Sequence, residues 1–213
     1  MARWGMVIDL RKCVGCQTCT VACKQANGLP PGVAWRRVAD CEAGAYPEVR
    51  RLFLPLGCMQ CGDPPCLPVC PTTATRRRPD GVVTIDETLC IGCGYCVVAC
   101  PYRARTLITA DGAAFDGDPT PAEARTARPG RIGTATKCTF CIGRVDAGRR
   151  GGLEPGRDPE ATPVCVASCI AGALHFGDLD DPRSEVARLI RGHRTLRLLE
   201  PLGTDPSVHY IGG

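Results

Sequence analysis

Four groups of cysteines carry the chemistry of this 213-residue chain, and together they account for all but one of its 17 cysteines. Three closely spaced thiolates can ligate three corners of one [4Fe–4S] cube, and a fourth, three residues further on, is carried away to a neighbouring cube. The spacing therefore predicts four [4Fe–4S] clusters. The four runs are Cys13, Cys16, Cys19 and Cys23; Cys58, Cys61, Cys66 and Cys70; Cys90, Cys93, Cys96 and Cys100; and Cys138, Cys141, Cys165 and Cys169.

The third run, which ends in Pro101, is the C-x2-C-x2-C-x3-C-P run of bacterial ferredoxins. The second run has two extra residues after Cys61, and the fourth has a long insertion after Cys141. No run has Trp, Asp or Ser where a cysteine is due, so neither a [3Fe–4S] centre nor an open catalytic iron is expected. We also find no nucleophile–base pair, phosphate-binding loop or catalytic carboxylate pair, and we expect electron transfer without catalysis.

Zinc is the main alternative, because zinc sites commonly use two C-x2-C pairs about 12–20 residues apart. The split fourth run would suit zinc, but cysteines packed as tightly as in the other runs fit a cube better than one ion. Disulfides are not expected, since the cysteine count is odd, the spacings are tight and the opening MARWGMVIDLRK does not resemble a secretory leader.

Four residues with metal-binding side chains remain outside the runs. Cys41 is interpreted as a small buried or half-exposed side chain. His175, His193 and His209 are not spaced as a ligand set and are interpreted as surface or lightly buried residues. A hydrogen bond to a cluster is the minor alternative for His175.

The formal charge of +4 counts cysteines as neutral. Because a cube of core charge 2+ held by four thiolates is a dianion, four clusters would bring the loaded protein to about −4. We therefore interpret part of the arginine excess as compensation of cluster charge and expect no nucleic-acid partner. The basic run 76–78 is either a solvated strand, a docking site for an acidic partner, or part of that compensation. No apolar run is long enough to span a bilayer.

The elements that must position the runs are short. Strands are predicted at 4–10, 49–56 and 173–176, a helix at 18–25, and a hairpin at 75–85 around Pro79-Asp80-Gly81. Residues 110–133 are predicted to be a long loop. A helix is predicted at 184–199, starting at Asp181-Pro182, and the tail 201–213 is predicted to extend over a surface. With 5% aromatic residues, an aromatic-rich core is not expected, and the metal-free chain should be largely unfolded. Gly15, Gly92 and Gly94 either permit tight turns or donate N–H groups to sulfur.

At this point the chain resembles a known family. The stretches CVGCQTCTVACK, GCMQCGDPPCLPVCPTTAT, CIGCGYCVVACPYRAR and KCTFC…CVASC are similar to the four-cluster iron–sulfur subunits of molybdopterin oxidoreductases of the dimethyl-sulfoxide-reductase type. That family includes the electron-transfer subunits of dimethyl sulfoxide, polysulfide, thiosulfate, tetrathionate and arsenate reductases, of sulfite dehydrogenases and of phenylacetyl-CoA:acceptor oxidoreductases. Lys24 and Ile170 depart from the proline that follows each ferredoxin run, but no ligand is missing.

The resemblance implies which cysteines share a cluster, because the first run pairs with the last and the two middle runs pair with each other. It implies cluster A with Cys13, Cys16, Cys19 and Cys169; cluster B with Cys23, Cys138, Cys141 and Cys165; cluster C with Cys58, Cys61, Cys66 and Cys100; and cluster D with Cys70, Cys90, Cys93 and Cys96. The implied fold is α+β: a central ferredoxin-like unit (57–109) inserted into a terminal one (1–56 and 134–180), a connecting loop (110–133), and a C-terminal helix and tail (181–213).

The implied function is that of an electron-transfer subunit, not an enzyme on its own. Its implied partners are a molybdopterin catalytic subunit, facing the terminal unit, and a membrane-anchor subunit or other electron carrier, facing the central unit. We expect association with the membrane through a partner, at the cytoplasmic face, with the periplasm after co-export as the alternative. A free-standing polyferredoxin and a zinc-binding structural module are the competing functions. The sequence does not indicate the partner's substrate or the direction of electron flow.

Overall fold

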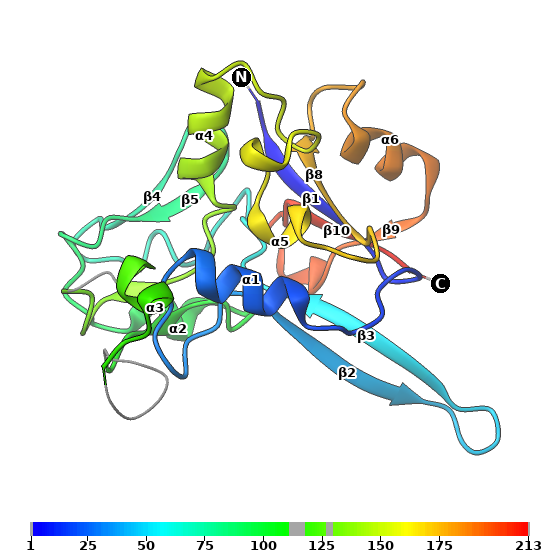
Figure 1. The fold of residues 1–213 in the computed structure, drawn as a ribbon, viewed down its shortest axis with the longest axis horizontal. Coiled ribbons are helices and arrows are strands. Elements are labelled where there is room, and N and C mark those ends of the chain that lie inside the picture. Colours follow the sequence, from blue (N-terminus) through cyan, green and yellow to red (C-terminus); the bar gives the residue numbers. More distant parts are fainter. Residues whose placement is uncertain (1, 111–117, 127–129, 213) are drawn as a thin grey trace.

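The computed structural model describes residues 2–110, 118–126 and 130–212, and it has an α+β fold of short elements (Figure 1). The longest described helices have nine residues, and none could span the apolar interior of a bilayer. The helices are α1 (Thr18–Ala26), α2 (Tyr95–Ala99), α3 (Pro121–Thr126), α4 (Ile142–Arg150), α5 (Val164–Ala167) and α6 (Glu185–Gly192). The strands are β1 (Trp4–Asp9), β2 (Arg37–Ala43), β3 (Arg50–Leu56), β4 (Thr75–Arg77), β5 (Val83–Ile85), β6 (Thr106–Leu107), β7 (Ala135–Thr136), β8 (Leu174–Asp178), β9 (Thr195–Leu196) and β10 (Val208–Ile211).

The main sheet joins the two ends of the chain in the order β8-β1-β10-β9. Strand β1 pairs antiparallel with β8 and parallel with β10, so that Met6 lies between Phe176 and Val208. Side chains alternate between the faces of a strand. Met6 and Ile8 belong to the large core that also contains candidate ligand cysteines, whereas Val7 packs on the opposite face with Val186 of α6.

Helix α6 confirms the predicted helix in position but not in its bounds. Its first turn is capped by Ser184, whose Oγ accepts a hydrogen bond from the N–H of Ala187, rather than by the expected Asp181-Pro182 pair. It ends at Gly192 instead of 199, because the backbone of His193 is extended and the following strand β9 pairs with β10. Tertiary pairing therefore overrides the helical pattern of 193–199.

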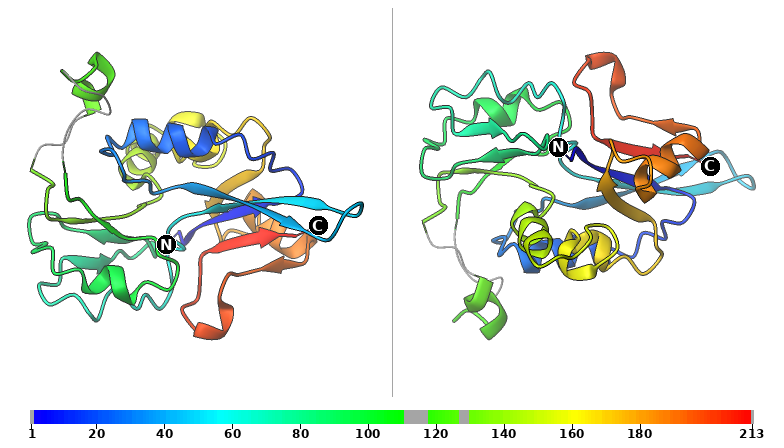
Figure 2. Two further views of the ribbon diagram at one scale, coloured as in Figure 1. Left: turned by 90° about the horizontal axis from the view of Figure 1, so that it is seen from below. Right: turned by 90° about the horizontal axis from the view of Figure 1, so that it is seen from above.

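The prediction for the tail is wrong. Residues 208–211 do not lie across a surface but form the inner strand β10, and Tyr210 is fully buried. The Tyr210 hydroxyl donates a hydrogen bond of 2.9 Å to the carbonyl of Pro55. The C-terminus therefore completes the sheet that begins at Trp4, as the red and blue strands in Figure 2 show.

Three separate two-stranded sheets accompany this sheet. The predicted strands at 49–56 and 75–85 are confirmed as β3 and as the β4–β5 hairpin. Strand β2, which we did not predict, pairs with β3 along its whole length, and the two extend away from the body of the molecule (Figure 1). Strand β7 pairs with β6, which brings residues 135–136 beside the central segment just before the fourth run.

The long loop predicted at 110–133 is wrong in one respect: it contains α3 (Pro121–Thr126). Residues 111–117 and 127–129 of that prediction lie outside the described residues. The insertion in the fourth run folds as α4 and a 3₁₀ turn (Pro159–Ala161), which return the chain to Cys165 at α5.

An aromatic-rich core was not expected, yet the large core contains Trp4, Trp35, Phe140, Phe176 and Tyr210. Although they are few, they gather beside the main sheet. Trp4 stacks on Phe176 with ring centroids 5.3 Å apart, and Phe140 meets Phe176 edge-on at 5.5 Å. The smaller core of the central segment is different, since its four buried residues are Cys66, Val83, Cys96 and Ala135. There, two of the core side chains are candidate ligands.

Candidate iron–sulfur sites

In the central segment, eight cysteines line two small cavities, four to each. Cys58, Cys61, Cys66 and Cys100 line one, together with Tyr102 and Arg105. Cys70, Cys90, Cys93 and Cys96 line the other, together with Thr72, Gly92 and Gly94. Each cavity thus combines three cysteines of one run with the last cysteine of the other, the same sets that the family resemblance implied for clusters C and D.

The terminal segments bring the first and fourth runs together. Burial raises the pKa of the Cys23 thiol, and the nearby Cys138, Cys165 and Cys141 raise it further, so these four lie within electrostatic reach of one another. Burial also raises the pKa of Cys19, to which Cys165 and Cys169 contribute. The structure therefore brings Cys23 together with the second to fourth members of its expected set and brings Cys19 near Cys169.

The burial of these thiols has a chemical consequence. Burial raises the pKa of Cys61 to about 12, and the neighbouring Cys58, Cys66 and Cys100 contribute to the shift. Burial likewise raises the pKa of Cys138 to about 12. A raised pKa favours the protonated thiol, whereas a thiolate is the form that binds metal. Binding of metal at Cys61 and Cys138 would therefore displace a proton from each.

The same local geometry positions the first and third runs. In both, a glycine with positive φ precedes the second cysteine (Gly15, +69°; Gly92, +70°), and a second left-handed residue precedes the helix (Gln17, +61°; Gly94, +77°). The helices α1 and α2 then carry the third cysteine of each run, Cys19 and Cys96, into the interior. The left-handed residues let the chain turn tightly around the candidate cluster site, and the helix then leads away from that site.

Five backbone N–H groups donate hydrogen bonds of 3.3–3.5 Å to candidate ligand sulfurs. Bonds of this kind tune the potential of an iron–sulfur cluster. In the described residues the donors are not the expected Gly15, Gly92 and Gly94, whose positive φ supports their other role in the turns. The pairs are Thr75 to Cys70, Ala104 to Cys100, Ala135 to Cys90, Phe140 to Cys138, and Ala173 to Cys169.

Replacing Gly92 by alanine should impair the site lined by Cys90 and Cys93. A Cβ on Gly92 would lie 2.0 Å from the carbonyl oxygen of Gly133, and φ is already in the left-handed region. We expect a loss of about 3 kcal/mol in the free energy of unfolding and reduced iron content. Gly133→Ala is the matched control, because φ is +82° there but the space is open, and about 1 kcal/mol is expected. Equal losses for both variants in denaturant titrations would contradict the steric explanation.

Buried cations accompany the cysteines, as the charge balance suggested. The Arg105 guanidinium is 3% exposed and donates a 3.0 Å hydrogen bond to Cys66 Sγ. Arg36 is 5% exposed, and its Nη2 lies 3.0 Å from Met6 Sδ and 3.7 Å from Cys165 Sγ. Burial by itself lowers the pKa of Arg36, but Cys165 and Cys138, when they are thiolates, outweigh it and raise the pKa overall.

The basic run 76–78 lies mostly in solvent. Arg76 and Arg77 are exposed, whereas Arg78 pairs with Asp80 and Asp146 and so links the β4–β5 hairpin to α4. These positions favour the solvated-strand interpretation over compensation of cluster charge.

The remaining metal-binding side chains lie apart from the sites. Cys41 is exposed on β2, which contradicts the buried or half-exposed interpretation. His175 Nδ1 lies 3.0 Å from a carboxylate oxygen of Glu185, and its buried Nε2 has no hydrogen-bond partner, a cysteine included, among the described residues. His193 Nδ1 meets the carbonyl of Leu189, and burial lowers the pKa of His209.

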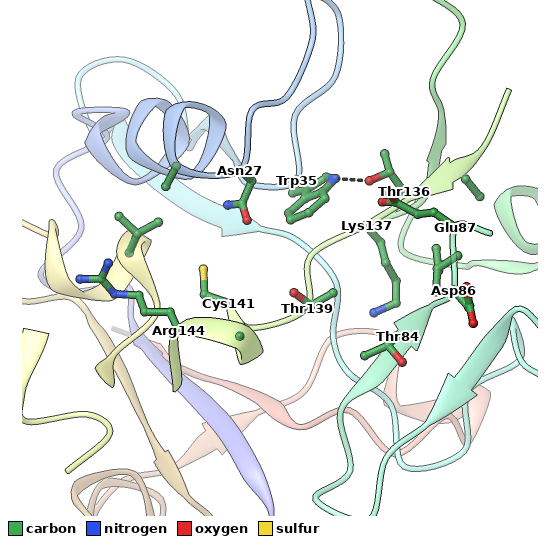
Figure 3. A pocket seen from close by; sticks show the side chains of 15 residues that line it. Asn27, Trp35, Thr84, Asp86, Glu87, Thr136, Lys137, Thr139, Cys141 and Arg144 are labelled. Carbon is green, nitrogen blue, oxygen red and sulfur yellow. Dashed lines mark hydrogen bonds between the residues drawn. The ribbon is translucent and has the colours of Figure 1, made fainter. Parts of the chain in front are cut away.

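One larger cavity, of about 560 Å³, lies beside Cys141 between α1, β5 and the start of α4 (Figure 3). Its wall includes Asn27, Trp35 and Lys137, and the Trp35 indole donates a hydrogen bond to Thr136 Oγ1. Asp86 and Glu87 line the side that belongs to the central segment. It contains one candidate ligand only, so it adjoins the metal sites without being one of them.

The donor set fits four cubes. Thiolate ligands suit a cationic iron–sulfur core, and N–H groups directed at the sulfurs and buried arginines beside them suit the net negative charge of the core with its four thiolates. Within the described ranges, no three His, Cys, Asp or Glu side chains form a group that could hold a single metal ion.

Comparison with known proteins identifies the family. A model described as a 4Fe-4S dicluster domain matches residues 49–114, and one described as a 4Fe-4S binding domain matches residues 4–25. The chain is 43% identical to a selenate reductase subunit of Mesobacillus selenatarsenatis, over 98% of this chain and 72% of that one. It is 40% identical to a tetrathionate reductase subunit of Salmonella typhimurium, over 99% and 72%. It is 36% identical to the arsenate respiratory reductase iron–sulfur subunit of a Shewanella species, over 98% and 96%. The chain therefore belongs to the iron–sulfur subunits of the molybdopterin oxidoreductases, which carry electrons through four [4Fe–4S] clusters and catalyse no reaction of their own.

Proposed function

We propose that clusters A, B, C and D, with the ligands grouped as above, form one electron path in that order. The path runs between a molybdopterin catalytic subunit at cluster A and a membrane-anchor subunit, or another electron carrier, at cluster D. The clusters supply the one-electron chemistry. The chain sets their order, their surroundings and the faces at which electrons enter and leave.

The order rests on electrostatic interactions that link successive clusters. Cys19 of A lies within electrostatic reach of Cys165 of B, and Cys138 of B lies within reach of Cys58 of C. Arg105 donates a hydrogen bond to Cys66 of C and also interacts with Cys96 of D. Each step of the proposed path therefore has an interaction of its own. This series of interactions is the observation that carries the proposal.

Two ferredoxin-like units are the arrangement that this order requires. The unit with A and B would be built from both ends of the chain, held together by the β8-β1-β10 sheet. The unit with C and D would be residues 57–109, with β7 packed at its edge. Residues 198–205 tie the two together, because Thr204 and Asp205 accept backbone hydrogen bonds from Asp63 and Gly62 beside cluster C.

The two ends of the path have the same surface character. The exposed candidate ligands of the described chain are Cys16, in cluster A, and Cys93, in cluster D. In the sequence beside the cysteines of cluster A, large apolar side chains are exposed at Val14, Val21 and Ile170. Beside the cysteines of the third run they are exposed at Leu89, Ile91, Tyr95 and Val98.

The exposed positions correspond between the first and third runs. Val14 and Ile91 each follow the first cysteine of a run, and Val21 and Val98 each precede the last cysteine by two residues. Apolar side chains around an exposed cluster ligand suit a partner that excludes water and comes close to the cluster. We call the surface of Val14, Val21 and Ile170 the A face, and the surface of Leu89, Ile91, Tyr95 and Val98 the D face. The catalytic subunit is proposed to cover the A face and the membrane-linked partner the D face.

Single charges introduced on these faces test the assignment. Val21→Glu should lower the molybdenum that copurifies per tagged chain by about tenfold or more, because an interface would have to bury the carboxylate. Val98→Glu should keep the molybdenum but release the complex from the membrane fraction. Leu202→Glu, at an exposed apolar position away from both faces, should change neither. Retention of both partners by both variants would contradict the assignment of these faces, and a wild-type chain that copurifies with neither partner would favour a free-standing polyferredoxin.

A further inference from the structure

Three cations are buried within the electron path, and none is paired with a carboxylate among the described residues. Arg36, Arg105 and Lys137 are 5%, 3% and 2% exposed. Their polar contacts are with sulfur, a hydroxyl and backbone carbonyls, not with Asp or Glu. A buried charge without a counter-charge is strongly unfavourable, so the negative partner of each cation must lie elsewhere.

Each cation lies at a different junction of the path. Arg36 interacts with Cys19 of cluster A and with Cys165 and Cys138 of cluster B. Arg105 donates to Cys66 Sγ of cluster C, to Thr75 Oγ1 at 3.1 Å, and also interacts with Cys96 of cluster D.

Lys137 lies at the remaining junction, between B and C. Its Nζ donates hydrogen bonds to the carbonyls of Cys138 and Val83 and favours the thiolate of Cys66. Figure 3 shows its side chain extending from the segment after Thr136 toward β5, across the boundary between the two proposed units. One cation thus stands at each of the three junctions A–B, B–C and C–D.

We propose that Arg36, Lys137 and Arg105 are positioning residues that set the reduction potentials of the clusters on either side of them. This proposal rests on the ligand grouping of the proposed function. A cluster becomes more negative by one charge when it accepts an electron, and no bond forms or breaks. A nearby cation in a medium of low dielectric stabilises that reduced state and raises the potential. A cation shared by two clusters also reduces the repulsion between them when both carry an electron.

Potentials of the loaded full-length chain test this inference. Arg105→Gln removes the charge and keeps a hydrogen-bond donor on a shorter side chain. We expect it to shift the reduction equilibrium of two clusters, C and D, by tenfold or more toward the oxidised form, which is 59 mV for one electron. Arg36→Gln should shift the other two clusters in the same direction. Arg105→Lys, which keeps the charge, should stay close to the wild-type potentials.

The measurement is an EPR-monitored redox titration of protein purified without air, after iron and sulfide have been quantified for each variant. Arg77→Gln is the control, because it removes the same charge from an exposed position on β4. If either arginine variant fails to load, the variant in the other unit decides the question. Unchanged potentials in a fully loaded Arg105→Gln or Arg36→Gln protein, or an equal shift in Arg77→Gln, would overturn the inference. A wild-type protein without four clusters would instead refute the proposed ligand grouping.

Discussion

Removal of iron is expected to unfold residues 57–109 while leaving part of the main sheet intact. The regular structure of this central segment is small: β4 and β5 have three residues each, and α2 has five. Two of the four buried residues in its core are Cys66 and Cys96, which are candidate ligands. Without metal there is too little apolar burial to offset the entropy of ordering the chain, so binding free energy is also folding free energy.

The main sheet has a conventional core and should respond differently. Met6, Ile8, Phe176 and Tyr210 are buried there independently of any metal. This refines the simple expectation that the whole metal-free chain is unfolded. After the iron has been removed with a chelator and the cysteines kept reduced, hydrogen exchange should show protected amides in β1, β8 and β10 but few in β4 and β5. Native-like protection of residues 75–85 without iron would contradict the role assigned to the clusters.

Replacing Cys138 by serine is expected to interrupt electron transfer along the whole path. Cys138 is a buried ligand of the proposed cluster B, and it interacts electrostatically with Cys58 of the central segment. Substitution of residues that support a metal ligand lowers activity roughly 10–100-fold. Loss of the ligand itself should lower the rate of electron transfer by more than that. Iron should fall by about one to four atoms per chain, depending on whether the cube loses one corner or is lost completely.

Cys41→Ser is the matched control for that variant. Cys41 is exposed on β2 and belongs to no proposed cluster, so its replacement should leave the iron content and the transfer rate unchanged. The rate would be measured by stopped-flow, from a reductant that acts at one face to an acceptor at the other. If Cys138→Ser loses iron yet transfers electrons at the wild-type rate, the linear order A–B–C–D is wrong.

The secondary-structure elements that depend on short stretches of sequence were predicted correctly. The strand at 4–10, the helix at 18–25 and the hairpin at 75–85 were predictable because apolar periodicity and turn residues specify them. The cysteine spacings identified the four runs in the same way. The grouping of cysteines between runs came from the family resemblance, since spacing within a run does not determine which distant run completes a cube.

Long-range pairing was not predictable. Strand β10 has four residues and is placed by pairing with β1, almost the whole chain away in sequence. Strand β2 has a polar, exposed sequence (RVADCEA) and forms because β3 pairs with it. Nor does the sequence distinguish Arg36 and Arg105 from the many solvated arginines. Charged residues are rarely fully buried without a partner, so their burial becomes intelligible only beside the cysteines.

Metal analysis with EPR tests the central claim most directly. The full-length chain would be purified without air, its iron, sulfide and zinc quantified, and its spectrum recorded after reduction. The proposed assignment of the sixteen cysteines predicts about sixteen irons and as many sulfides per chain, with the magnetic interaction expected of neighbouring [4Fe–4S] clusters. A colourless protein that contains zinc and no sulfide would contradict it.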